Sequence, residues 1–195
     1  MLNWLYVFVL IEFALVICLS MDEDEENEED ECERAKLLAL VSSLTFLKLD
    51  IPYGVERPIM LFQSISHQTN LEILSLDMLN VKCDFSFQNL THLQTLYIST
   101  TYMNVLPPLP LLETFVWGLE DMKETMAVPA LFKLDWSTHF PSLKRFGMGG
   151  VYFSEWAEQL ASVLPTQLTS LHVGFLGALE PGLKTTRLLT KLKQM

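Results

Sequence analysis

The sequence predicts an α/β solenoid, in which short parallel strands stack side by side and helices and irregular segments cover one face of the resulting sheet. Three observations lead to this prediction. An L-x-x-L-x-L pattern of apolar residues recurs along most of the chain. The second half of each copy has an apolar residue at every other position, as a half-buried strand does. The segments between copies contain both helical periodicity and proline-rich stretches.

The repeated pattern occurs six times, and every copy has apolar or aromatic residues at its three motif positions. Successive copies start 19 to 31 residues apart, beginning at Leu44, Leu71, Leu93, Leu112, Leu143 and Leu168. A seventh copy begins at Leu189 and is cut short at Met195. We therefore expect the array to lack a complete last repeat and the chain to be a fragment of a longer protein.

The physical basis of the prediction is the burial of one side of each strand. In a strand, alternate side chains point to opposite faces, so the motif residues would point inward and their neighbours outward. One such strand cannot bury its apolar side alone, and stacking of successive units provides the shared core.

The segments between the copies are expected to return the chain along the other side of the sheet. A helix is predicted over Pro58–Ser66, where the early proline suits a first turn. A second helix is predicted over Ser154–Leu164, which starts with a capping serine and ends before Pro165. The three prolines within Val105–Pro110 exclude a helix there and favour an extended segment.

On these residues the chain resembles the leucine-rich-repeat family over residues 35–195, about four-fifths of its length. The unit from Phe87 to Ile98 is the most similar one. The Asn or Cys that the family usually has after the strand is mostly absent, with Asn80 as the clearest candidate. The resemblance implies about six irregular repeats that form a curved parallel sheet, with helices and irregular segments on its convex side.

Members of this family usually bind their partners on the concave face, which the outward strand positions form. Carried over to this chain, the resemblance makes Tyr97 the best candidate contact, because an aromatic ring with a polar tip gives a large contact area at low entropy cost. Lys48, Asp77 and His172 would add charge or hydrogen bonds. The alternative for each residue is an ordinary solvated strand position. The complete set of central outward positions is Lys48, Ser75, Tyr97, Val116, Gly147 and His172, followed after the strand by Asp50, Asp77, Ser99, Gly118, Gly149 and Gly174.

Two segments of different composition precede the array. Residues 1–20 are apolar except for Asn3, Glu12 and Ser20, which predicts a signal peptide or a transmembrane anchor. Glu12 and the absence of an early basic residue leave open a buried helix or a misassigned start. Residues 21–34 contain ten carboxylates between Asp22 and Glu33 and predict a disordered acidic linker.

Charge and motif content argue against several classes of function. The formal net charge of −11 arises from the acidic run and Glu12, so the array itself is neutral and offers no basic surface for nucleic acid. The four histidines lie in different repeats, and no nucleophile motif, paired carboxylates or zinc-ligand spacing is present. We therefore expect neither an enzyme nor a protein with a metal or cofactor.

Two modifications depend on whether the chain is exported. Asn89 with Thr91 forms an N-glycosylation sequon on the approach to a strand, where the asparagine should face outward. Cys32 and Cys83 could pair in an oxidising compartment, or Cys83 could be a buried free thiol of the repeat core.

The expected function is recognition of another protein through the concave face, in a secreted or membrane-anchored protein. The alternative is a cytoplasmic adaptor of the same repeat class, for instance a substrate-recognition subunit of a ubiquitin ligase or an acidic histone-binding protein. No F-box is readable in the sequence, and the acidic segment precedes the repeats here.

Overall fold

The computed structural model describes residues 14–16, 35–36, 38, 44–51, 59–78, 82–83, 86–100, 102–103, 106–118, 133–151, 160 and 162–175. Over these ranges the chain is an α/β protein built around one parallel sheet, as the sequence predicted.

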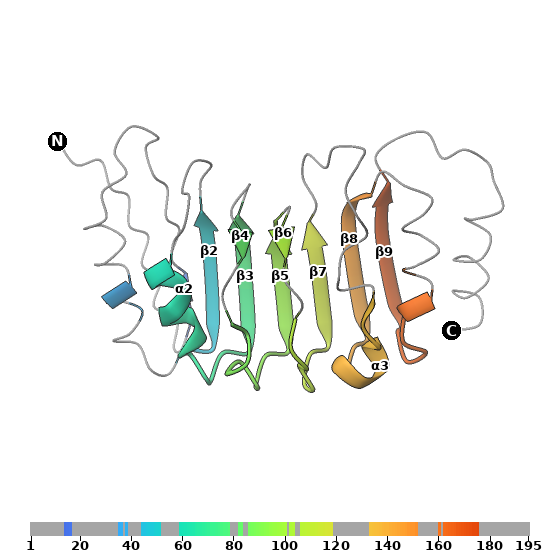
Figure 1. Ribbon diagram of the computed structural model, residues 1–195, viewed down its shortest axis with the longest axis horizontal. Coiled ribbons are helices and arrows are strands. Elements are labelled where there is room, and N and C mark those ends of the chain that lie inside the picture. The colour runs from blue at the N-terminus through green and yellow to red at the C-terminus, as the bar shows by residue number, and fades with distance from the viewer. Residues whose placement is uncertain are drawn as a thin grey trace.

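The sheet contains seven strands, and each strand lies beside the next one of the sheet along the chain (Figure 1). Its order is β1-β2-β3-β5-β7-β8-β9, and all six pairings are parallel. The strands are β1 (Ala14–Val16), β2 (Phe46–Ile51), β3 (Ile73–Met78), β5 (Thr95–Ser99), β7 (Thr114–Gly118), β8 (Arg145–Val151) and β9 (Ser170–Phe175). The six from β2 to β9 are the strands that the repeated motif predicts.

The register of the sheet matches the register of the sequence motif. Leu47 pairs with Leu74, and Leu74 pairs with Leu96. The same row continues through Phe115, Phe146 and Leu171. Equivalent motif positions therefore lie side by side from β2 to β9, and this arrangement stacks their side chains in one core.

The turns that lead into the strands also repeat the same hydrogen bonds. The Thr45 carbonyl accepts from the backbone N–H groups of Glu72 and Ile73, at 2.8 and 2.9 Å. The carbonyls of Glu72, Gln94, Glu113 and Lys144 each accept in the same way from two consecutive residues of the next unit. Each unit thus fixes the entry of the following strand, which accounts for the constant register despite unequal repeat lengths.

The described helices lie in the segments that connect the strands, and these segments return the chain along one face of the sheet. Helix α2 (Ile59–Ser66) confirms the helix predicted over Pro58–Ser66. Helix α3 (Trp136–His139) was not predicted, and the Asp135 carboxylate caps it by accepting from the Ser137 N–H at 3.0 Å. That carboxylate also accepts from the Thr138 hydroxyl at 2.7 Å, and this hydrogen bond is the main reason that the pKa of Asp135 lies below its ordinary value.

Other predicted segments are described only in part. Leu160, Ser162 and Val163 are helical, and the rest of the helix predicted over Ser154–Leu164 lies outside the described residues. Leu106–Pro110 contains no helix, as its prolines required. Asn80, Cys32 and the partial seventh repeat at Leu189 also lie outside the described residues. Cys83 belongs to β4 (Lys82–Cys83), which pairs with β6 (Tyr102–Met103) in a small second sheet that was not predicted.

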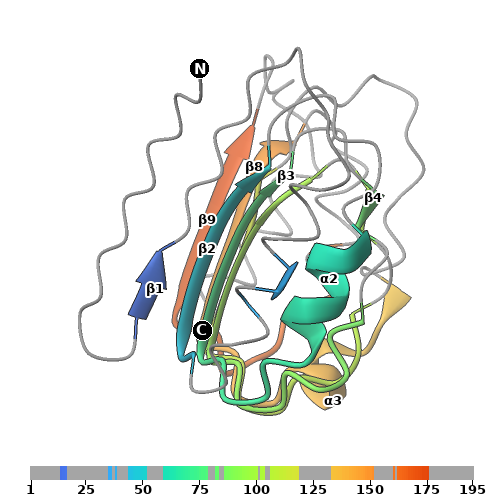
Figure 2. The same ribbon diagram turned by 90° about the vertical axis from the view of Figure 1, so that its left-hand side faces the viewer.

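The view along the sheet separates its two faces. Figure 2 shows α2 and α3 on the same side of the strands, and no described helix covers the opposite side. The core lies between the strands and the returning segments. Its strand residues are fully or almost fully buried, among them Leu47, Leu74, Leu96, Phe115 and Phe146.

Of the first twenty residues, only Ala14–Val16 is described, and it forms β1 beside β2. Among the described residues, no helix has the length and apolar character to span a membrane. The assignment of residues 1–20 as a signal peptide or anchor, and of residues 21–34 as a linker, therefore stays a prediction.

Candidate functional site: the outward face of the sheet

The side of the sheet without described helices is formed by alternate residues of each strand. In β3 and β5 the other residues are half-buried or exposed, and the buried positions are Leu74, Leu76, Met78, Leu96 and Ile98. We call the surface made by these intervening residues the outward face. Its described positions from β5 to β9 are Thr95, Tyr97, Ser99, Thr114, Val116, Gly118, Arg145, Gly147, Gly149, Ser170 and His172.

Three of the predicted contact residues fall in one row across this face. Lys48 pairs with Ser75, which pairs with Tyr97, and the row continues through Val116 and Gly147 to His172. Asp77 lies one row further along the strands, beside Ser99. All four predicted residues are therefore on the same face, but they are spread over four strands and do not form one pocket.

Tyr97 is the most prominent apolar side chain of this face. It is 43% exposed and lies near the middle of the sheet, with Ser75 and Val116 as its register partners. A tyrosine at such a position cannot be explained by the core, because the core residues of β5 are Leu96 and Ile98. Asp77 and His172 are also exposed, and Lys48 is half-buried.

Three glycines belong to β7 and β8, with Gly118 and Gly147 at outward positions and Gly149 where the register between β8 and β9 shifts. A Cβ atom at Gly147 would come within 3.3 Å of the Val116 methyl groups, and one at Gly118 within 3.2 Å of the Ser99 hydroxyl. A Cβ atom at Gly149 would meet nothing within 4 Å. Gly147 is buried and Gly149 is half-buried, so the open space over β8 lies above Gly149.

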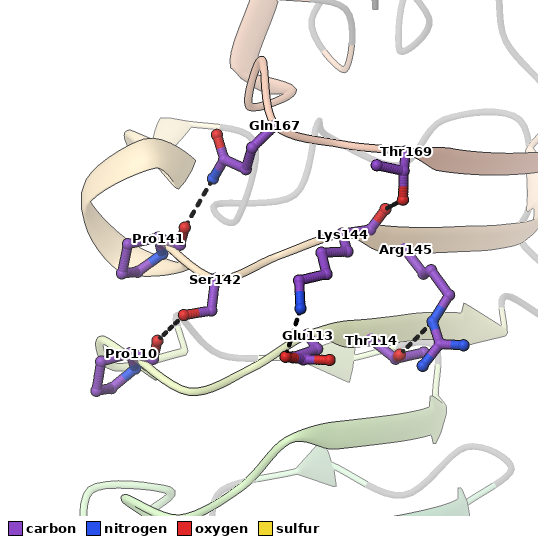
Figure 3. Close-up of polar contacts among 9 residues, drawn as sticks. All are labelled: Pro110, Glu113, Thr114, Pro141, Ser142, Lys144, Arg145, Gln167 and Thr169. Atoms are coloured by element: carbon purple, nitrogen blue, oxygen red, sulfur yellow. Dashed lines mark hydrogen bonds and ion pairs between the residues drawn. The ribbon is translucent and has the colours of Figure 1, made fainter.

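Arg145 is an exposed residue of this face that the sequence reasoning missed. Its Nε donates to the Thr114 hydroxyl at 2.9 Å, and Thr114 is 6% exposed (Figure 3). The sequence could have placed Arg145 on this face, because it precedes the central position Gly147 by two residues. A two-residue spacing keeps side chains on one face of a strand.

Polar contacts between residues that directly precede the strands join neighbouring repeats close to Arg145. The Lys144 ammonium lies 2.7 Å from the Glu113 carboxylate. Ser142 donates to the Pro110 carbonyl at 2.6 Å, Gln167 to the Pro141 carbonyl at 3.0 Å, and the Thr169 hydroxyl to the Lys144 carbonyl at 3.1 Å (Figure 3). The hydrogen bond from Lys144 and its positive charge lower the pKa of Glu113, and the charge of Arg145 adds to this effect.

The described histidines do not gather into a reactive or metal-binding group. Nδ1 of His67, His92 and His139 each lies within 3.1 Å of a backbone carbonyl, in three different turns. In the described part of the chain no three potential metal ligands come together. What the outward face offers is a contact surface with an exposed aromatic ring, a hydrogen-bonded cation and open space above Gly149.

The sequon asparagine lies away from the outward face. Asn89 is exposed in the turn between Phe87 and Leu93, while Leu90 beside it is buried. The Leu90 N–H donates to the Phe87 carbonyl at 3.0 Å, so the turn itself keeps Asn89 outside the core.

Comparison with family models finds no match to this chain. A search of curated proteins finds none with significant sequence similarity.

Proposed function

We propose that the chain is a leucine-rich-repeat solenoid that recognises another protein through the outward face of its sheet, which would be the concave face of the array. The observation that carries the proposal is the continuous row from Lys48 to His172, in which a 43% exposed tyrosine lies between Ser75 and Val116. Aromatic side chains in such positions are enriched among the residues that dominate protein–protein binding.

The repeated bonding pattern supports the leucine-rich-repeat part of the proposal. Motif leucines share one register across five strand pairs, and successive turns use the same pair of N–H donors. Repeats that contact only their neighbours in this way are typical of solenoids, which use extended faces for binding.

Alanine substitution on the two sides of the sheet tests the binding face. Tyr97→Ala should weaken binding to a partner isolated with the full chain by about tenfold or more, as expected for an interface hot spot. Met60→Ala is the matched control, because Met60 is 47% exposed on α2 at the other side of the sheet. Equal losses from both variants would refute the outward face as the binding surface.

We propose that the protein is exported or membrane-anchored, with Asn89 glycosylated. The exposed turn position of Asn89 supports this assignment. Expression in secretory cells should yield a protein that loses mass on Endo H treatment, and Asn89→Gln should abolish that change. An unglycosylated cytosolic product would contradict export.

A cytoplasmic adaptor is the second candidate, and β1 favours it. Ala14–Val16 pairs in register with β2, with Leu15 beside Leu47. Cleavage after Ser20 would remove this strand, and a membrane anchor would require the same residues as helix. Mass spectrometry of the mature protein distinguishes the candidates, because the adaptor retains residues 14–16 in a cytosolic product.

A further inference from the structure

The charged side chains of the outward face differ along the sheet, and the described residues of β2 and β3 include both Lys48 and Asp77. Among the described outward positions from β5 to β9 there is no carboxylate, whereas Arg145 is exposed there. The Glu113 carboxylate, which precedes β7, is paired with Lys144 at 2.7 Å. The described outward positions from β5 to β9 therefore carry positive charge, although the whole chain has a formal charge of −11.

Arg145 is held in a way that suits recognition of an anion. Its Nε donates to Thr114 at 2.9 Å, which orients the guanidinium group and leaves its terminal amino groups as donors. A planar guanidinium binds a carboxylate through two parallel hydrogen bonds, and prior orientation lowers the entropy lost on binding.

The glycines beside Arg145 provide room for a chain to approach. Arg145 and Gly147 occupy alternate positions of β8 and therefore share one face, and Gly149 follows where the register between β8 and β9 shifts. Beside Gly147 lie Val116 on one strand and His172 on the other, and the space over Gly149 is open. An extended segment that lies along β8 can place a carboxylate at Arg145 and an apolar side chain toward Tyr97.

We propose that the partner is a protein that presents an acidic, extended segment, whose Asp or Glu carboxylate pairs with Arg145 while its backbone occupies the open space above Gly149. This inference rests on the proposed function, because it names the partner chemistry of the same face.

Selection from a library of random dodecapeptides on the full immobilised chain, at physiological ionic strength, tests the proposal. Selected peptides should be enriched in Asp and Glu, and copies with Asn and Gln in their place should bind about tenfold more weakly or worse, as loss of a charge-assisted hydrogen bond predicts. No selected peptide, or selection without acidic enrichment, would overturn the acidic-partner inference.

Substitutions in the full chain test whether Arg145 binds the selected acidic peptides, with binding measured by fluorescence anisotropy. Arg145→Gln should weaken binding of the acidic peptides about tenfold, and Arg145→Lys should retain part of the affinity. Lys144→Gln is the matched control and should change affinity less than about twofold, as a neighbouring exposed cation in a surface pair. Thermal unfolding checks that each variant is folded. Equal effects of Arg145→Gln and Lys144→Gln contradict the site.

Two further variants separate failure of this inference from failure of the proposed function. Gly149→Gln should fill the open space without a clash at its Cβ and weaken peptide binding, as should Tyr97→Ala. Neutral peptides that bind in a manner sensitive to both variants would leave the outward face as the binding surface and overturn only the acidic partner. Peptides that bind equally well to both variants would overturn the face itself.

Discussion

The buried core is built from different side chains behind strands β2 to β5 and behind strands β7 and β8. From β2 to β5 the inward positions are aliphatic, with leucines at 47, 74 and 96 in one row. From β7 to β8 the same row contains Phe115 and Phe146, and Trp136 and Phe140 pack against them. The outward face shows the opposite difference in side-chain size. Its large residues Phe46, Ile73 and Tyr97 lie on β2, β3 and β5, whereas β7 and β8 have glycines.

Repeat length explains the change inside the core. The unit between Leu112 and Leu143 is the longest, and it includes α3, which places Trp136 under the sheet. A longer returning segment encloses more volume, which large aromatic rings fill at the density of protein interiors. Trp136 lies 4.9 Å from Phe146, measured between ring centroids, in an edge-to-face arrangement. The strands therefore stay equivalent in register, while the buried side chains behind them differ from repeat to repeat.

The largest expected effect comes from removing the centre of the aromatic half. Trp136 is fully buried, so Trp136→Ala should lower the free energy of unfolding by about 3–5 kcal/mol, measured by chemical denaturation. Leu111→Ala, at a 45% exposed position, is the control and should change stability by no more than about 0.5 kcal/mol. A small loss for Trp136→Ala would show that α3 contributes little to the core.

An aromatic residue in the aliphatic half should be tolerated poorly. Leu96 and Phe115 are register partners, and Leu96→Phe places a ring where the shorter repeats leave no extra volume. We expect a loss of about 1–3 kcal/mol from overpacking. If Leu96→Phe proves neutral in denaturation experiments, the proposed difference in core volume between the halves is wrong.

The glycines of the outward face should respond differently to alanine. Gly149→Ala meets open space and reduces the freedom of the unfolded chain, so it should stabilise the protein by about 0.4–1 kcal/mol. Gly147→Ala should gain less or destabilise, because its Cβ would lie 3.3 Å from the Val116 methyl groups. The difference in melting temperature between the two variants measures this contrast. A larger gain for Gly147→Ala than for Gly149→Ala would contradict the open space assigned to Gly149.

The smallest expected effect concerns the ion pair between Glu113 and Lys144. Because the folded state lowers the pKa of Glu113, the pair stabilises the protein above the unfolded-state pKa, and this contribution is lost as pH falls through the folded-state value. Glu113→Gln should therefore lower the melting temperature slightly near neutral pH and not at acidic pH. Glu72→Gln is the matched control, because the next repeat has Gln94 instead of a lysine at the equivalent position. A constant difference across pH would contradict the assignment.

The sequence by itself determined the six strands of the repeated motif, their parallel order and the face on which their residues lie. Alternation of apolar residues fixes which side is buried, and the recurrence of the motif fixes which residues become neighbours. For this reason Lys48, Tyr97 and His172 could be placed in one row before the fold was known. Helix α2 was also predictable, because its periodicity and initial proline are local signals.

Tertiary structure decided what depends on contacts between distant residues. Strand β1 pairs with β2 across about thirty residues of sequence, and α3 is too short to leave a periodic signal. The orientation of Arg145 depends on Thr114, which lies 31 residues earlier. The open floor over Gly149 likewise depends on what neighbouring strands leave uncovered, and a local pattern contains no information about that space. Local periodicity specifies a strand and its faces, whereas the shape and charge of a binding surface arise only when several strands are side by side.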